Sequence, residues 1–134
     1  MNLLLDTHIV LWALNDDPAL SARARQLILD PDNTVYYSVL SVWEVALKHR
    51  RRPQEIPFDE NDLVEACRSA GFEPLTLSEE HVLGVQSLSR PEGAREHHDP
   101  FDRLLLAQAK AERMAFLTHD ELIQGYGERC VIPV

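Results

Sequence analysis

Short apolar runs alternate along this chain with longer segments whose apolar residues recur at helical spacing, and this alternation constrains the fold more than any other feature. It is typical of a parallel β-sheet whose faces are covered by helices. The sequence therefore predicts an α/β fold with a mainly parallel central sheet. Strands are expected at residues 2–5, 34–38, 73–77, 115–118 and 130–133.

Segments of helical periodicity fill the intervals between the predicted strands. Several of them follow a Ser or an Asp, which are among the best residues for capping a helix N-terminus. The least patterned segment, residues 89–98, contains Pro and Gly and reads as a loop. Helices are expected at residues 7–14, 19–29, 40–50, 60–70, 79–88, 100–113 and 119–125, with caps that include Ser21, Asp59, Ser78 and Asp99.

Length and charge limit the class of protein. A chain of 134 residues is expected to form a single domain, residues 1–134. Its formal net charge of −9 argues against a broad, charge-driven grip on nucleic acid, although an enzyme can concentrate carboxylates at one site and recruit cations there. Cys67 and Cys130 lack a metal-binding spacing and are expected to be buried free thiols. The apolar N-terminus has no basic leader and is interrupted by Asp6 and His8, so we expect a soluble cytoplasmic protein without a membrane segment.

Two aspartates stand where predicted strands end. Asp6 follows the run "LLL" directly, and Asp120 comes just after "AFLT". In open parallel sheets, ligands bind outside the carboxyl ends of the strands, so both residues fall at the expected edge. Asp is also a favoured helix N-cap, and the sequence leaves both interpretations open.

Glu44 lies within "SVLSVWEVALKHR", on the same helical face as Leu40 and Leu47. A partly buried carboxylate is costly unless another group compensates its charge. Lys48, four residues later, is the simplest structural partner for it. A structural and a functional role for Glu44 therefore stand as equal alternatives.

The stretch "HHDPFDRLLLAQAK" places two aspartates three residues apart. With Asp99 as N-cap, Pro100 is the first helical residue and Asp102 the third, which is close to a capping box. Asp102 shares its helical face with Leu105 and Ala109, so it is expected at the rim of the buried stripe. We interpret Asp99 mainly as a cap and Asp102 mainly as a metal ligand.

Four carboxylates from separate segments are thus expected to converge at one end of the sheet, where their like charges would repel one another. They are Asp6, Glu44, Asp102 and Asp120. A divalent cation resolves this repulsion, and a carboxylate-rich site favours Mg²⁺ or Mn²⁺. Such a site suits metal-assisted hydrolysis of phosphodiester bonds. Three histidines adjoin these aspartates without a zinc-binding spacing and are interpreted as hydrogen-bonded loop residues. They are His8, His98 and His119.

The chain has one dense basic patch, Arg50, Arg51 and Arg52, directly after the third predicted helix. Cations are favoured at helix C-termini, so a solvated helix end explains the patch. The alternative is contact with RNA, because an acidic protein needs a local positive surface beside its acidic centre.

Five stretches spanning nearly the whole chain have a specific order and spacing: "LLLDTHIVLWAL", "DDPALS", "SVLSVWEVALK", "HHDPFDRLLLAQA" and "FLTHDELIQGYG". With them, the sequence resembles PIN-domain ribonucleases, specifically the VapC-like toxins of bacterial and archaeal toxin–antitoxin pairs. The resemblance implies a three-layer α/β/α sandwich and Mg²⁺-dependent endoribonuclease activity. Toxins of this type usually form homodimers and are held inactive by a small antitoxin, so both partners are expected here. The implied acidic quartet is Asp6, Glu44, Asp102 and Asp120, with Asp99 as an accessory acid. Thr7 and Thr118 lie nearby in the sequence and are expected to bind substrate.

Two other classes fit the length and the alternation. A receiver-like signalling domain would use a sheet-edge aspartate as phosphoacceptor, but it requires an acidic pair after the first strand and a lysine late in the chain. Asp6 stands alone, and no lysine follows Lys110. A non-catalytic interaction module would be favoured if no divalent ion bound.

Overall fold

The computed structural model of the chain describes residues 1–56 and 58–134. Within them, five strands form one sheet in the order β3-β2-β1-β4-β5, and all four strand pairings are parallel. The predicted parallel sheet is confirmed. The strands are β1 (Asn2–Leu5), β2 (Thr34–Ser38), β3 (Glu73–Leu75), β4 (Ala115–Thr118) and β5 (Val131–Pro133).

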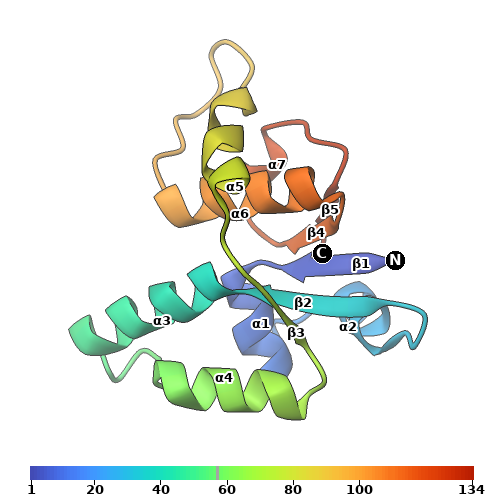
Figure 1. Ribbon diagram of the computed structural model, residues 1–134, viewed down its shortest axis with the longest axis vertical. Coiled ribbons are helices and arrows are strands. Elements are labelled where there is room, and N and C mark those ends of the chain that lie inside the picture. Colours follow the sequence, from blue (N-terminus) through green and yellow to red (C-terminus); the bar gives the residue numbers. More distant parts are fainter. Residues whose placement is uncertain (57) are drawn as a thin grey trace.

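The described helices are α1 (Thr7–Leu14), α2 (Ala22–Leu29), α3 (Val39–Arg51), α4 (Glu60–Ser69), α5 (Glu79–Gly84), α6 (Pro100–Glu112) and α7 (Glu121–Gln124). They cover both faces of the sheet (Figure 1). Helices α1, α2 and α4, with the body of α3, pack on one face, whereas α5, α6 and α7 lie on the other. The chain is therefore the predicted three-layer α/β/α sandwich.

The central strand β1 is buried on both faces, which explains its unbroken apolar run. Leu3 and Leu5 belong to the core layer beneath α1 and α2, whereas Leu4 packs in the opposite layer with Phe116 and Leu105. Side chains alternate along a strand, so a strand between two helix layers needs apolar residues at successive positions. Polar residues resume only after Leu5, where the strand ends.

Four predicted helix caps are confirmed. In each, the side chain accepts a hydrogen bond from a backbone N–H of the helix that follows. These contacts fix where α2, α4, α5 and α6 begin. The caps are Ser21, Asp59, Ser78 and Asp99.

Several predicted boundaries shift for local reasons. Helix α2 begins at Ala22 instead of residue 19, because Ser21 is its cap. The helix expected to reach residue 88 ends at Gly84, and a 3-10 turn, Val85–Ser87, follows it. There the Ser87 hydroxyl donates to the Gly84 carbonyl at 2.7 Å, which replaces a helical partner. Helix α6 ends at Glu112 because Arg113 adopts a left-handed conformation with φ 56°.

A buried polar network fixes α6 against the sheet. The Ser38 hydroxyl, at the end of β2, donates to Oε1 of Gln108 on α6 at 2.5 Å. On α5, His81 Nδ1 accepts from the Ser78 N–H at 3.1 Å, so the neutral ring donates from Nε2 to Glu112 at 2.7 Å. The network ties β2, α5 and α6 together, and the first turn of α6 contributes to the site described below.

Cys67 is buried and Cys130 is only partly buried, and both are free thiols. The expectation of buried thiols is thus right for Cys67 and wrong in degree for Cys130. Among the helices of the described residues, none has the length and apolar character needed to cross a membrane.

Candidate active site

The carboxyl ends of β1 and β4 lie side by side in the middle of the sheet. Leu5 pairs with Leu117, and the chain proceeds from β1 toward β2 on one side and from β4 toward β5 on the other. Such a reversal of direction in a parallel sheet leaves a crevice beyond the strand ends, where ligands bind in open α/β folds. Asp6 and Asp120 follow these two strands, at the edge where the sequence predicted them.

Asp6 is 3% exposed and is held at both carboxylate oxygens. The Thr7 N–H donates to Oδ1 at 2.8 Å, and the Thr118 hydroxyl donates to Oδ2 at 2.7 Å. Burial raises the pKa of Asp6, while the Thr118 bond and the nearby His8 lower it in part. Each carboxylate oxygen has two lone pairs, so both oxygens of Asp6 keep one for a further ligand.

Thr118 also links Asp6 to Asp120. Its hydroxyl accepts from the Asp120 N–H at 3.0 Å, and Asp120 in turn caps α7 by accepting from the Leu122 N–H at 2.8 Å. Both aspartates are therefore helix N-caps, and both also lie at the candidate site. The two interpretations left open by the sequence are compatible, because capping uses only part of a carboxylate's lone pairs.

Glu44 on α3 is 3% exposed and fully engaged. The Thr7 hydroxyl donates to Oε1 at 2.7 Å, and the Lys48 ammonium donates to Oε2 at 2.6 Å. The Ser41 hydroxyl lies 2.8 Å from the Thr7 hydroxyl and must donate to it, because the Thr7 proton points to Glu44. Lys48 thus neutralises a buried carboxylate, as the structural interpretation proposed, while Thr7 joins Glu44 to Asp6.

Thr7 and Thr118 are themselves buried, and their hydroxyls are used in positioning carboxylates. A direct role for them in substrate binding stays a prediction.

The two aspartates of α6 divide their roles. Asp99 Oδ1 accepts from the Phe101 N–H at 2.9 Å and the Asp102 N–H at 3.2 Å, so it is the cap. A reciprocal bond from Asp102 to the Asp99 N–H, which a capping box requires, is absent among the described residues. Asp102 instead turns its carboxylate away from the cap, and its side chain is 14% exposed.

The pKa of Asp102 shows most clearly that the carboxylates lie near one another. Burial raises its pKa to about 8, and the negative charges of Asp6, Asp99, Asp120 and Glu44 contribute to the rise. These four residues come from segments far apart in the sequence. The structure therefore brings the predicted quartet and its accessory acid within electrostatic reach of one another.

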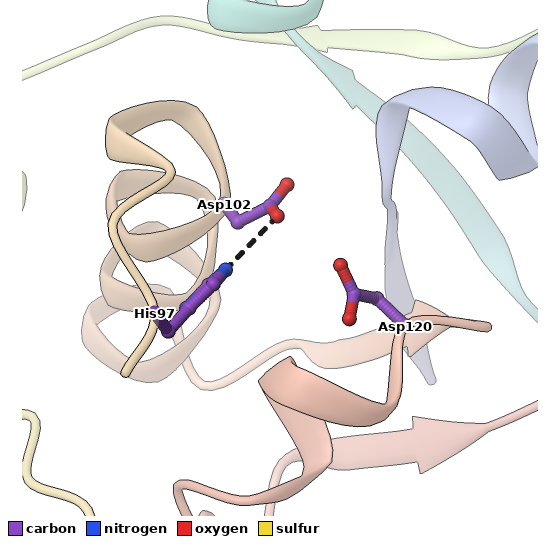
Figure 2. Close-up of side chains that lie close together, drawn as sticks. All are labelled: His97, Asp102 and Asp120. Carbon is purple, nitrogen blue, oxygen red and sulfur yellow. Dashed lines mark hydrogen bonds and ion pairs between the residues drawn. The ribbon is translucent and has the colours of Figure 1, made fainter. Parts of the chain in front are cut away.

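One member of the site was missed in the sequence. His97 is buried, and its Nε2 lies 3.1 Å from Asp102 Oδ2, while its Nδ1 lies 2.9 Å from the Tyr126 hydroxyl. Its ligand atom and those of Asp102 and Asp120 lie within 4.8 Å of one another, and Figure 2 shows the two carboxylates facing each other beside the imidazole. Burial lowers the pKa of His97, which favours the neutral ring.

The three histidines considered from the sequence do not join this group in the described structure. No spacing rule identifies His97, because its partners Asp102 and Tyr126 are brought to it by the tertiary structure.

The basic patch is split between two surfaces. Arg51 and Arg52 line a hollow of about 520 Å³ together with Lys48, and Arg52 pairs with Glu55 at 3.3 Å. Arg50 lines a different hollow, between α3 and α4, beside Trp43. Arg50 and Arg51 belong to the last turn of α3, so the favourable location of cations at a helix C-terminus also applies.

Comparison with known proteins identifies the family. The family model described as the PIN domain matches residues 3–128. The chain belongs to the PIN domain family. PIN domains are nucleases, and membership supports hydrolysis of phosphodiester bonds over the receiver-like alternative. No curated protein sequence matches the chain.

Two solved structures share the fold at low sequence identity. The structure of VapBC2 from Rickettsia felis, bound to a DNA fragment from its promoter, matches with a TM-score of 0.70 and 18% identity, over 100% of this chain and 98% of that one. The structure of VapBC-1 from nontypeable Haemophilus influenzae matches with a TM-score of 0.59 and 17% identity, over 94% and 92%. The similarity covers nearly the full length of each PIN fold.

We predict that Asp99→Ala lowers the free energy of unfolding by about 0.5–2 kcal/mol, because α6 loses its N-cap, while substantial nuclease activity remains. The matched variant Asp102→Asn removes one crowded charge, so it should keep or slightly raise metal-free stability and lose most activity. Chemical denaturation and nuclease assays measure both effects. An inactive, normally stable Asp99→Ala beside an active Asp102→Asn would reverse this assignment.

A second prediction concerns pH. The folded-state pKa of Asp102, about 8, exceeds the ordinary aspartate value of 3.8, so the folded protein binds this proton more tightly than the unfolded chain. The contribution of Asp102 to stability is therefore present at low pH and is lost as the pH rises toward 8. In chelator-treated protein, the melting temperature of Asp102→Asn minus that of the parent should increase as the pH rises from about 5 to 8. Parallel melting profiles for the two proteins would show that Asp102 titrates normally.

Proposed function

We propose that this protein is an Mg²⁺-dependent endoribonuclease, with Mn²⁺ as a substitute ion, and that it acts as the toxin of a toxin–antitoxin pair. The observation that carries the proposal is the crowding of carboxylates from separate segments around Asp102, whose pKa rises to about 8. A site of this kind is built to receive a positive charge. Membership of the PIN family supports the nuclease class.

The donor set fits a divalent cation. Asp6, Asp102 and Asp120 would hold it, since each keeps free lone pairs. Ligand atoms of Asp102 and Asp120 lie within 4.8 Å of each other, whereas Asp6 is tied to Asp120 through Thr118 and contributes to the raised pKa of Asp102. Glu44 and Asp99 are proposed to complete the negative charge of the site, with Glu44 paired to the Lys48 ammonium and Asp99 capping α6 through Oδ1. When bound, Mg²⁺ would neutralise charge on the phosphate and lower the pKa of the attacking water.

The surrounding residues hold the acids in place. The Thr118 hydroxyl connects Asp6 with the backbone of Asp120, so the carboxyl ends of β1 and β4 present their acids as a unit. His97, fixed by the Tyr126 hydroxyl, orients the Asp102 carboxylate from the other side. With both ring nitrogens engaged, His97 acts in this proposal as a positioning residue.

RNA is the proposed substrate, and the local distribution of charge supports a path for it. A chain with net charge −9 must contact phosphates through a small positive surface. The hollow lined by Lys48, Arg51 and Arg52 adjoins Glu44 through the Lys48 ammonium, so a strand at the acidic site would pass along it.

An antitoxin and a second copy of the chain are the proposed protein partners. The two solved structures compared above are described as VapBC2 and VapBC-1, which supports an antitoxin. An antitoxin arginine would suit the crowded carboxylates, since its guanidinium pairs with two oxygens at once. Exposed apolar side chains supply surface for such contacts, Trp43 on α3 in one place and Leu77, Val82 and Leu83 around α5 in another.

The decisive experiment is cleavage of total RNA by the purified protein, with and without Mg²⁺. We expect cleavage only with the metal, and we expect Asp6→Asn to abolish most of it. Mg²⁺ or Mn²⁺ should also raise the melting temperature of the parent, because the ion binds the folded state. If Asp6→Asn/Asp120→Asn gains as much thermal stability from metal as the parent, the ion binds elsewhere.

The split of the basic patch provides a matched test of the RNA path. Arg51→Gln/Arg52→Gln should weaken binding of single-stranded RNA and reduce the slope of log affinity against log salt by about 0.7 for each lost phosphate contact. Arg50→Gln removes one charge from the other hollow and should change both quantities much less than Arg51→Gln or Arg52→Gln made singly. Equal effects of Arg50 and its two neighbours would mean that only net charge matters.

A further inference from the structure

A hollow of about 460 Å³ adjoins the acidic site on the α1 side. Two of its lining residues touch the site directly, since Thr7 and Lys48 both donate to Glu44. Lys48 also lines the hollow of Arg51 and Arg52, so the two hollows meet at its side chain. A nucleic acid strand that lies along the hollow of Arg51 and Arg52 would therefore border this space as well.

The distinctive residue of the hollow is Trp12. It lies on α1, is partly buried, and packs against the core layer that contains Leu3 and Leu5. Two further rings flank it, with ring centres of His8 at 6.0 Å and of His119 at 5.7 Å. A tryptophan supported in this way loses little conformational freedom when another flat group lies against it.

Two polar lining residues, Asn15 and Lys48, complement a nucleotide, and the carboxylates of Asp17 and Glu55 line the same hollow. Asn15, at the C-terminal end of α1, provides both an amide donor and a carbonyl acceptor, and its side chain makes no hydrogen bond within the described residues. Lys48 is 47% exposed and presents its ammonium between the hollow and the acidic site. A base offers a flat face for the aromatic ring and a polar edge for the amide, while its phosphate suits the ammonium.

We propose that this hollow is a nucleobase subsite, in which a base beside the cleaved phosphate of the RNA stacks on Trp12. The proposal rests on the proposed ribonuclease function and names the part of the protein that gives it base preference. The apolar hollow at Leu77, Val82 and Leu83 has no aromatic ring or amide among its lining residues and is not suited to a base.

The chain contains only two tryptophans, which allows a direct test. Trp43→Phe leaves Trp12 as the sole tryptophan, and Trp12→Phe leaves Trp43. Each is combined with Asp102→Asn so that the RNA stays intact, and each is titrated with a single-stranded hexaribonucleotide. RNA should change the fluorescence of Trp12 and leave that of Trp43 nearly constant. The reverse pattern, with Trp43 alone responding, would overturn the proposal.

Affinity measurements test the same contact without relying on fluorescence. In the Asp102→Asn background, Trp12→Leu should bind the hexaribonucleotide about 5- to 150-fold more weakly, the usual effect of losing one stacked base. Trp12→Phe keeps an aromatic face and should stay within a few-fold of the Trp12 protein. Trp43→Leu is the control at an exposed position. A series of RNAs, each lacking the base at one position, should include one whose affinity is the same for Trp12→Leu as for the protein that keeps Trp12.

The outcomes separate this proposal from the proposed function. If the parent cleaves RNA with Mg²⁺ but Trp12→Leu and the Trp12 protein bind RNA equally, the subsite is wrong and the ribonuclease stands. If the parent does not cleave but RNA still perturbs Trp12, the subsite stands and the catalytic proposal fails. If Trp12→Leu leaves RNA binding unchanged and weakens only the complex with the antitoxin, the hollow is a protein contact and the proposal is overturned. Melting curves of Trp12→Leu and Trp12→Phe establish that both variants are folded.

Discussion

Repulsion among buried carboxylates is the constraint on which the rest of this structure depends. Burial raises the pKa of Asp102 to about 8, and the negative charges of nearby carboxylates add to the rise; such crowding opposes folding when no cation is present. These carboxylates are Asp6, Asp99, Asp120 and Glu44. The fold tolerates it because the two most buried acids have specific partners. Thr118 and a backbone N–H hold Asp6, while Thr7 and Lys48 hold Glu44. Among the described residues, the side chain of Asp102 has a single hydrogen-bond partner, the imidazole of His97, so the unrelieved repulsion falls on it.

The same acids also begin helices. Asp6 caps α1, Asp99 caps α6 and Asp120 caps α7, so the N-termini of three helices meet at the site. The N-terminal end of a helix carries partial positive charge, which stabilises nearby carboxylates. Removing any of these acids therefore changes both helix stability and site charge. This coupling makes Asp99 and Asp102 informative as a pair, because only Asp99 uses its carboxylate for the cap of α6.

Positively charged side chains near the C-terminal end of α3 lie beside this acidic centre. Lys48 stands at the junction, since it pairs with Glu44 and lines the hollows on both sides of its own turn of α3. One hollow continues to Arg51 and Arg52, and the other to Trp12 on α1. In the proposed ribonuclease, RNA phosphates would lie along the hollow of Arg51 and Arg52, and a base would lie in the hollow of Trp12. Affinity and base preference would then come from different surfaces that share one lysine.

The sequence by itself determined the fold and the edge of the sheet where the candidate site lies. A run such as "LLL" can be buried on both faces only inside a covered parallel sheet, and Ser or Asp before a periodic segment caps a helix locally. Both signals lie within a few neighbouring residues, so strands, helices and the edge that carries Asp6 and Asp120 were predictable. The exact ends of α2, α5 and α6 were less so, because single contacts at Ser21, Ser87 and Arg113 set them.

The tertiary structure alone decided which side chains meet. His97, not its neighbour His98, turns inward to Asp102, because Tyr126 from the far end of the chain accommodates its ring. The tertiary structure likewise separates Arg50 from Arg51 and places Trp12 in one hollow with Thr7 and Lys48. These contacts join residues that are distant in sequence, and their energies depend on distances that appear only when the sheet and its helix layers have packed. Local patterns specify elements, whereas packing specifies the partners of each side chain.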